Sequence, residues 1–480
     1  KNTVTVNSEC ITKNSFILKN LDKKLKKGTK INYFVGVEGY STRHLSDKVV
    51  TMVIGVGNMN SKIDEDNLQI IWGGKVSVPF RQKVVAICKE LWGEQQKYVM
   101  ANALMIAMSV ETAETFSSSL IQLAKKGYIG VSKEEHKKNP DLVKGKPIGL
   151  AQFTKDAVVS LILKEKGILE NPTTASAITQ IEINNYKQKL ALLSPEDQLD
   201  YVKSYLMLFN NYKKVKRPED VYMIIFAPRA TGQGDYVDLY KKYLTKEDRD
   251  NKKVNPKYKE NASMDTKNDG FNKGNNDEII QSGELLSRYR EMKAKGLRYA
   301  IDVNEARKLN QVLAEKILKS GKVTFANSHV SKVIDKAMAQ DNINDTALGK
   351  NAKRSNYDNA PGGEVEIISE ILYILYELSK IYKLNISEIA GASHSSGSYH
   401  YKGTAIDINY IDGKHIDYLN FNEEFYIKFT EKVIKMGAKN VFHPYWSAKK
   451  AHRAENEGLR KMGGKWIPKS DHKDHIHIQI

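Results

Sequence analysis

The stretch that decides the fold reads SYHYKGTAID over residues 398–407, and its counterpart, DHIHIQI, occupies residues 474–480. Together they contain two histidines and one aspartate, His400, Asp407 and His477, which are ligands of the kind that zinc accepts. Three protein ligands leave a fourth position for water, which is typical of a catalytic rather than a structural zinc site. The sequence therefore predicts a catalytic zinc site in its last part.

The alternation of side chains along two predicted strands supports this grouping. In a strand over 404–410, Asp407 points away from the isoleucines that flank it, and in a strand over 475–480, His477 does the same. If the two strands are neighbours, both ligands lie on one polar face, with isoleucines on the other face forming the core.

Histidine is also concentrated in this part of the chain. The sequence has 11 histidines in 480 residues, and eight of them lie beyond residue 390. Scattered surface histidines are therefore a poor explanation. Gly403 allows the chain to turn so that His400 reaches the same site.

The motif SxHxxGxAxD that begins at residue 398, followed by HxH at residues 475–477, resembles the zinc D-Ala-D-Ala carboxypeptidases and endolysin endopeptidases of the LAS group. The resemblance covers about residues 323–480 and implies an α+β zinc peptidase. It also implies zinc ligation by His400, Asp407 and His477, with Asp474 as the general base and His475 supporting the tetrahedral intermediate.

Two features depart from the pattern of this family. Many members carry an Arg or Gln that polarises the substrate carbonyl, in a Ser-Gly-Tyr-Arg-like segment. Here the segment reads GASH over 391–394, so the role is unfilled or has passed to His394. Asp474 is out of alternation with His477, and it can face the metal only if the strand begins after it or bulges there. Asp471 is the alternative base.

A second candidate site centres on Glu111. Residues 103–110 predict a buried helix that ends at this glutamate. An apolar environment favours the neutral form of a carboxyl group, as a general acid requires. Two later segments accompany it, GLAQFT at 149–154 and VYMIIFAP at 221–228.

These three segments resemble the lysozyme-like lytic transglycosylases, especially the forms carried by phage tails and contractile injection systems. The resemblance covers about residues 72–242 and implies Glu111 as the catalytic acid, with Gln152 and Tyr222 in the substrate cleft. Ala113 stands where the family usually has Gly. In this family the acetamido group of the substrate can supply the second function, whereas a role for Glu114 would make the enzyme hydrolytic, so both outcomes stay open.

Length and charge set further limits. A chain of 480 residues is too long for one core, and a net charge of +18 favours a polyanionic partner. The basic runs lack the aromatic interleaving of a nucleic-acid platform, and no apolar stretch is long enough to span a membrane. We expect a multidomain fold, with a small β-rich N-terminal module at 1–72, an all-α lysozyme-like domain at 73–244, a polar linker at 245–300 and an α+β zinc peptidase domain at 301–480.

The expected function is that of a bifunctional peptidoglycan hydrolase, which cuts glycan strands through Glu111 and stem or cross-link peptides through a zinc-activated water. The alternatives are a single-activity zinc peptidase with a glycan-binding, catalytically silent lysozyme-like domain, and a structural component of a phage tail or injection device. One zinc ion per chain is the expected cofactor. Bacterial peptidoglycan is the expected partner, and a delivery apparatus or an immunity protein could be a further one. No signal peptide is visible, so we expect action in the periplasm or cell wall after delivery by a carrier apparatus, by lysis or by processing from a longer chain.

Overall fold

The computed structural model describes residues 68–123, 127–168, 178–265, 274–417, 419–444 and 472–480, together with the short strands at 30–33, 50–53 and 465–466. The chain divides into two units, Lys1–Glu65 and Asp66–Ile480. In the first unit, the strands β1 (Lys30–Tyr33) and β2 (Val50–Val53) pair antiparallel. Both fall in the part predicted to be a small β-rich module, and the rest of that module lies outside the described residues.

The second unit is mixed, with many helices and several small sheets. Its first part, the helical region (described residues 68–302), holds α1 (Val78–Trp92), α2 (Lys97–Glu111), α3 (Lys133–Lys138), α4 (Lys155–Glu165), α5 (Gln180–Leu192), α6 (Pro195–Met207), α7 (Asp220–Phe226), α8 (Lys246–Asp250), α9 (Pro256–Asn261) and α10 (Ser282–Gly296). Short antiparallel pairs join β3 (Gln69–Ile70) to β8 (Ile301–Asp302), β4 (Ile121–Leu123) to β5 (Gly127–Ile129), and β6 (Asp238–Lys241) to β7 (Ile279–Gln281). None of the described helices is long and apolar enough to cross a membrane.

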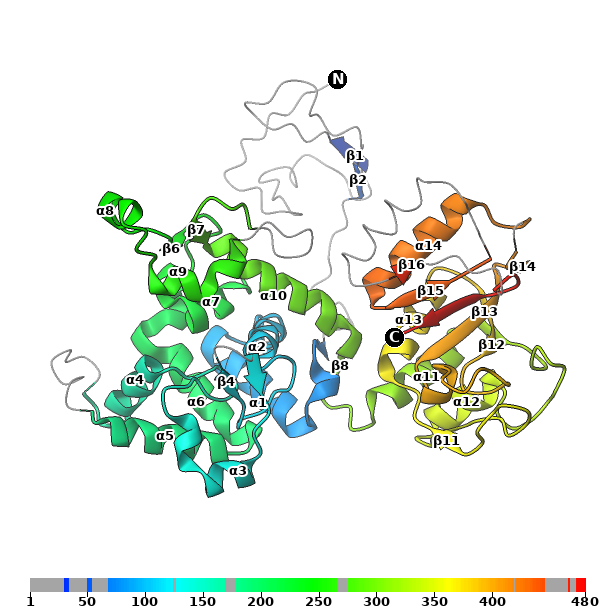
Figure 1. The fold of residues 1–480 in the computed structure, drawn as a ribbon, viewed down its shortest axis with the longest axis horizontal. Helices are drawn as coiled ribbons and strands as arrows, with labels where there is room; N and C mark the ends of the chain where they lie inside the picture. Colours follow the sequence, from blue (N-terminus) through cyan, green and yellow to red (C-terminus); the bar gives the residue numbers. More distant parts are fainter. Residues whose placement is uncertain are drawn as a thin grey trace. The chain divides into compact units, whose positions relative to one another are not determined.

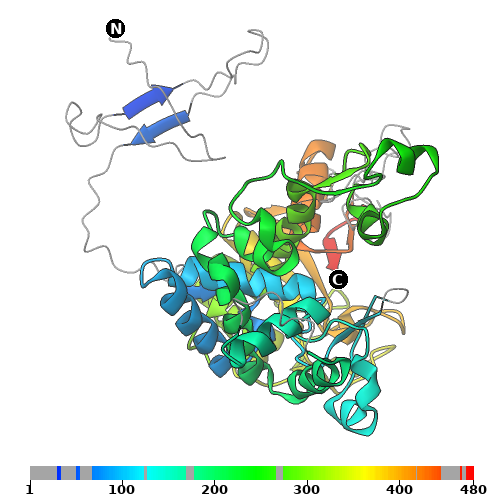
Figure 2. The same ribbon diagram turned by 90° about the vertical axis from the view of Figure 1, so that its left-hand side faces the viewer.

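Helix α2 is the centre of the helical region. Nearly every residue from Met100 to Glu111 is buried, as the apolar run predicted. A helix that is apolar on all sides needs partners on all sides, and α1, α7 and α10 all pack against α2. In Figures 1 and 2, α1 and α2, coloured blue to cyan, lie against green helices. Ser194 is the N-cap of α6, because its hydroxyl accepts the Asp197 N–H and Pro195 begins the helix.

The stretch at 245–300, expected to be a polar linker, differs from that expectation. It contains α8, α9, β7 and α10, and β7 pairs with β6. Helix α10 buries Leu285, Leu286 and Tyr289 in the hydrophobic core. The stretch is polar in composition, but these apolar residues share one helical face, so its second half belongs to the helical region rather than to a connection.

The sheet region (described residues 309–480) is built on a seven-stranded sheet. Its strands are β9 (Val323–Phe325), β12 (Leu384–Glu388), β13 (Ala405–Ile411), β14 (Lys414–His415), β15 (Asn440–Phe442), β16 (Lys465–Trp466) and β17 (Ile476–Gln479). They run in the order β16-β15-β17-β13-β12-β9, and β14 pairs with β13. The helices of this region are α11 (Leu309–Lys319), α12 (Ala339–Ala347), α13 (Ser369–Ser379) and α14 (Glu423–Met436), and a two-stranded pair joins β10 (Ala352–Lys353) to β11 (Glu364–Val365).

The two strands that carry Asp407 and His477 are neighbours, so the condition for a shared polar face is met. Strands β13 and β17 run antiparallel, with Asp407 opposite His477. The isoleucines of both strands on the other face, Ile406, Ile408, Ile476 and Ile478, are fully buried. The sheet therefore supplies an apolar core on one side and a polar face for the candidate site on the other, as the alternation predicted.

Candidate functional site

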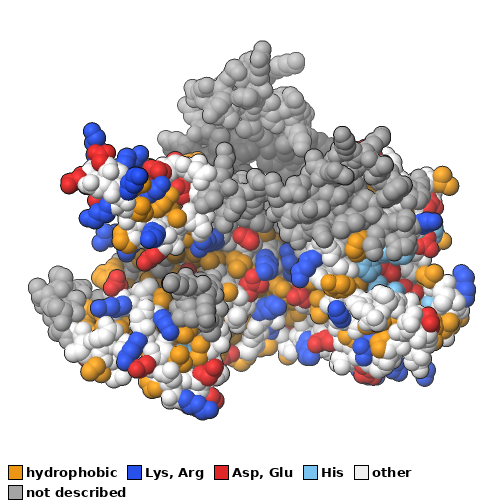
Figure 3. All heavy atoms as spheres, viewed as in Figure 1, with side chains coloured by type: hydrophobic (Ala, Val, Ile, Leu, Met, Phe, Trp, Pro, Cys, Tyr) orange, Lys and Arg blue, Asp and Glu red, His pale blue; other side chains and the backbone are white. Residues whose placement is uncertain are grey.

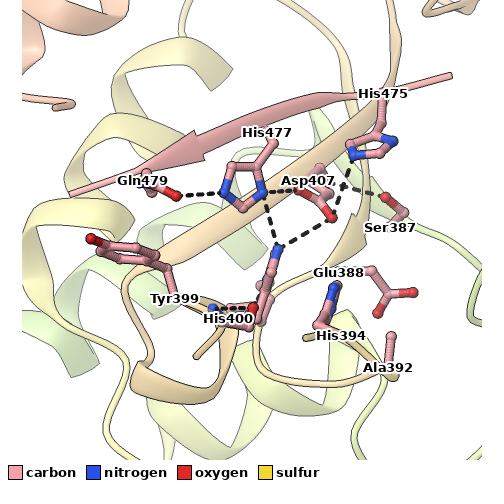
Figure 4. Close-up of polar contacts among 12 residues, drawn as sticks. Ser387, Glu388, Ala392, His394, Tyr399, His400, Asp407, His475, His477 and Gln479 are labelled. Carbon is pink, nitrogen blue, oxygen red and sulfur yellow. Dashed lines mark hydrogen bonds and ion pairs between the residues drawn. The ribbon is translucent and has the colours of Figure 1, made fainter. Parts of the chain in front are cut away.

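Three side chains from the polar face of the sheet and the adjoining turn come together. His400 begins the short 3-10 helix His400–Lys402, which ends at Gly403 in the left-handed conformation, and Asp407 and His477 lie on β13 and β17. His400 Nε2 is 3.2 Å from His477 Nδ1 and 3.3 Å from Asp407 Oδ2, and His477 Nδ1 is 2.7 Å from Asp407 Oδ1. Figure 4 shows the three side chains pointing toward one another, and all three are buried.

In each imidazole, the ring nitrogen that faces away from the cluster has a hydrogen-bond partner outside it. His400 Nδ1 lies 2.7 Å from the carbonyl oxygen of Ile389, so it donates, and Nε2 keeps its lone pair facing the cluster. His477 Nε2 lies 3.0 Å from Gln479 Oε1, which directs Nδ1 toward the same point. Such outer contacts on the second nitrogen are typical of histidines that ligate a metal, because they fix the tautomer and the ring orientation.

The charges of the cluster oppose the effect of burial. Burial alone would raise the pKa of Asp407, but the surrounding imidazoles, His400 foremost, hold it well below its usual range. Burial would lower the pKa of His400, and Asp407 raises it above its usual value. A buried carboxylate is costly unless a positive charge lies close to it. A proton or a metal cation between the carboxylate and the two ring nitrogens can provide that charge.

His475 lies beside this cluster, and Asp474 contacts His475. Strand β17 begins at Ile476, after both residues, so the condition under which Asp474 can face the site is met. His475 Nδ1 is 2.8 Å from Asp474 Oδ1, and His475 Nε2 is 3.9 Å from Asp407 Oδ2. The neighbouring imidazole of His475 lowers the pKa of Asp474, so its half-exposed carboxyl is ionised and able to accept a proton. Asp471, the alternative base, lies outside the described residues.

His394 lies against the cluster without belonging to it. Its ring stacks on His400 with centroids 4.2 Å apart and 7° between the planes, and its Nε2 lies 3.1 Å from the carbonyl oxygen of Gly391. Burial, with a smaller effect from His400, lowers the pKa of His394 to about 4, so the ring is neutral at pH 7. It stands where the resemblance expects a cationic or amide side chain, and it can offer only a neutral imidazole there.

A buried network behind the site was not anticipated from the sequence. Glu388 on β12 lies opposite Asp407 in the strand register and is 1% exposed. His329 Nδ1 is 2.7 Å from Glu388 Oε2, and His329 Nε2 is 3.0 Å from Asp335 Oδ1. One signal in the sequence could have revealed Glu388, since a glutamate at the end of an apolar strand is costly to bury without a partner. Its partner, His329, lies 59 residues earlier and carries no local signal.

Glu111 occupies the C-terminal end of α2 and is 8% exposed. Burial raises the pKa of its carboxyl group to about 7, while a hydrogen bond from Tyr222 and the charge of Arg288 oppose the rise. The structure therefore brings Glu111 and Tyr222 together, two of the residues that the motifs singled out. Arg288, on α10 in the expected linker, and Tyr205, whose pKa rises to about 12 through burial and the charge of Glu111, were not anticipated.

Gln152 and Glu114 have partners other than Glu111. Gln152 is buried in the left-handed conformation (φ 43°), and its amide nitrogen donates to the Gly149 carbonyl at 3.0 Å. Its amide oxygen has no partner in the described part of the chain. Glu114 forms an ion pair with Lys295 of α10. Among the residues that the structure describes, no hydrogen bond joins either side chain to Glu111, so their predicted roles stay predictions.

Figure 3 shows histidine side chains gathered with acidic ones on the visible face of the sheet region.

Comparisons with protein-family models, with curated proteins and with solved structures found no match to this chain. The functional assignment therefore depends on the residues and on their geometry.

Proposed function

We propose that this chain is a two-activity peptidoglycan hydrolase, with a zinc peptidase site in the sheet region and a glycosidase site in the helical region. The observation that carries the proposal is the buried group of His400, Asp407 and His477, whose ligand atoms all lie within 4.8 Å of one another. Two imidazoles and one carboxylate form a donor set typical of catalytic zinc, which keeps a fourth position open.

Two of the three donor separations agree with a metal site, whereas the third, 2.7 Å between His477 Nδ1 and Asp407 Oδ1, is a hydrogen-bond distance. Zinc–nitrogen bonds of about 2.0–2.1 Å in tetrahedral geometry place ligand atoms about 3.3 Å apart. The separations from His400 Nε2, 3.2 Å to His477 Nδ1 and 3.3 Å to Asp407 Oδ2, agree with that value. A bound Zn²⁺ supplies Lewis-acid chemistry, because it acidifies water and polarises a carbonyl group.

The residues around the cluster have separate tasks in this proposal. Asp474 accepts a proton from the attacking water and passes it to the leaving amine, since its carboxyl is ionised and half-exposed. His475, held by Asp474 at 2.8 Å, presents its second ring nitrogen toward Asp407 and steadies the developing oxyanion. His394 orients the substrate carbonyl through its imidazole.

For the glycosidase site, we propose Glu111 as the general acid. A carboxyl with a pKa of about 7 is largely protonated below neutral pH and can donate to a glycosidic oxygen. The carboxylate of Glu114 forms an ion pair with Lys295. This favours a mechanism in which Glu111 is the one carboxyl at work and the substrate's acetamido group supplies the second function.

Digestion of isolated peptidoglycan by the full chain tests both halves of the proposal, because mass spectrometry of the products reports glycan and peptide cleavage separately. We expect His400→Ala to lose peptide cleavage alone and Glu111→Gln to lose glycan cleavage alone. The matched control is Glu134→Gln, at an exposed position outside both sites. Unchanged product profiles for either active-site variant would refute the corresponding activity.

A further inference from the structure

A basic cavity lies in the helical region, formed by the loop before α4 together with the beginnings of α4 and α5. Its volume is about 440 Å³, within the range of roughly 300–1,000 Å³ that is usual for ligand pockets. Four of the residues that line it are lysines, and none is an aspartate or glutamate. The lysines are Lys144, Lys146, Lys155 and Lys187.

Two helices begin at this cavity. Thr154, the N-cap residue of α4, and Gln180, the first residue of α5, both line it. The N-terminal end of a helix carries a partial positive charge and backbone N–H groups without intrahelical partners, which favour anions. The N-cap hydroxyls of Thr154 and Thr179 each accept one such N–H group, those of Ala157 and Glu182. Both helices exceed ten residues, with lengths of 11 and 13, so each has a developed dipole.

Lys187 is the feature that distinguishes this cavity from a cluster of surface lysines. It is 2% exposed, and its Nζ donates to the carbonyl oxygen of Lys146 at 2.7 Å. An ammonium group has three donors, and no other acceptor or ion-pair partner of Lys187 is found among the described residues. Burial lowers the pKa of Lys187 to about 8, against the opposing effect of Asp156. A buried cation without a counter-ion is costly, and an anion in the cavity would remove that cost.

The acidic groups near the cavity leave it positive. Glu182, in the first turn of α5, accepts a hydrogen bond from the Thr179 N–H and forms an ion pair with Lys166 at 2.9 Å. Asp141 forms an ion pair with Lys144 at 2.8 Å, on the exposed side. Asp156, the second residue of α4, is exposed and does not line the cavity. Lys146, Lys155 and Lys187 therefore supply three positive charges without an ion pair among the residues that the structure describes.

We propose that this cavity binds a phosphate group, either free or as part of an anionic wall polymer. Lysine ammonium groups act as point charges toward phosphate, and paired helix N-termini are suited to the same anion. The excess of positive charge over the whole chain, +18, fits a protein that works on a polyanionic surface. This binding does not require Glu111 or the metal cluster to be catalytic.

Calorimetric titration of the full chain with inorganic phosphate, with a glycerol-phosphate oligomer and with polyglutamate tests the proposal. We expect saturable binding of a phosphate ligand that weakens roughly tenfold or more in Lys187→Met and in the double variant Lys146→Gln, Lys155→Gln, because each variant removes charge-assisted hydrogen bonds to the anion. The double variant has its changes at half-buried and exposed positions, so it tests the site even if Lys187→Met fails to fold. The control double variant, Lys89→Gln with Lys203→Gln, removes the same charge from lysines paired with Glu94 and Glu90.

The outcomes separate the two sources of phosphate. Tighter binding of the oligomer than of inorganic phosphate assigns the site to a wall polymer, and equal binding assigns it to free phosphate. The proposal is overturned if neither phosphate ligand binds saturably, if the control variant weakens binding as much as the cavity variants do, or if polyglutamate binds as tightly as the phosphate oligomer.

Discussion

Replacing Glu111 by glutamine should stabilise the protein above neutral pH while it removes glycan cleavage. The buried carboxyl has a pKa of about 7, compared with an ordinary value of 4.5. Each unit of difference between the two pKa values corresponds to about 1.4 kcal/mol, so ionised Glu111 destabilises the folded state by roughly 3 kcal/mol. Glutamine is nearly isosteric with the neutral acid, and its amide oxygen can still accept the hydrogen bond from Tyr222.

The pH dependence follows from the direction of this pKa change. Between pH 4.5 and about 7, the folded state binds more protons at Glu111 than the unfolded state does. The free energy of unfolding of the wild type therefore falls as the pH rises through this window. Below pH 4.5, Glu111 is neutral in both states and does not change the free energy of unfolding. Above about pH 7, it is ionised in both states and the whole destabilisation is present. Glutamine does not titrate, so the variant lacks this dependence.

Urea unfolding of both proteins from about pH 4 to about pH 8 measures the effect, because the difference between them cancels all other titrating groups. We expect the variant's advantage in free energy of unfolding to grow by roughly 3 kcal/mol across this range. Glu134→Gln, at an exposed position, is the matched control. A difference between wild type and Glu111→Gln that is independent of pH would refute the reasoning, since the carboxyl would then not be perturbed. In parallel, glycan cleavage by the wild type should decline above about pH 7, as the acid form is lost.

The other predictions concern the sheet region. His400→Ala should abolish zinc binding, measured by metal analysis, and peptide cleavage, because one of three ligands is lost; zinc at one equivalent per chain in this variant would contradict the assignment. Asp474→Asn should keep zinc but lower turnover on a wall peptide on the order of a hundredfold, as expected for a lost general base, whereas Asp471→Asn should be nearly silent; the reverse result would assign the base to Asp471. His475→Ala should lower turnover with the metal retained, as zinc content and turnover measured together will show. His329→Leu should destabilise the fold by about 3–5 kcal/mol in thermal or urea unfolding, because it leaves Glu388 buried without its partner; a neutral effect would exclude a charged pair there.

The polar face of the sheet could be predicted because strand geometry is local. Alternation with a period of two residues fixes which side chains share a face, so Asp407 and His477 could be placed together from the sequence once their strands were taken as neighbours. Their pairing opposite one another confirms that step. The same rule identified the difficulty with Asp474. Because β17 begins at Ile476, strand alternation no longer excludes Asp474 from the site, and its role stays a prediction.

The interactions that the sequence did not reveal are those between distant segments. His329 meets Glu388 across 59 residues, and Lys295 meets Glu114 across 181 residues, so no window of local pattern contains both partners. Composition also misled the interpretation of 245–300. One face of α10, together with Tyr258, Met264 and Ile280, ties that stretch to the core, and the average polarity of the stretch hides these few apolar residues.

Two buried carboxyl groups show how this fold can prepare different chemistry from the same side-chain type. Burial alone would raise the pKa of both Glu111 and Asp407, and they are similarly inaccessible, at 8% and 5% exposure. At Glu111, one hydrogen bond from a phenol and the charge of Arg288 only partly offset the rise in pKa that burial causes, so the neutral form persists to about pH 7. Asp407 faces imidazoles that keep its carboxyl ionised. The outer nitrogens of these imidazoles are hydrogen-bonded to Ile389 and Gln479, so their inner nitrogens face the Asp407 carboxylate. The first environment suits a group that gives up a proton, and the second suits a group that retains a cation. The two sites therefore differ because of their neighbours rather than because of their depth in the protein.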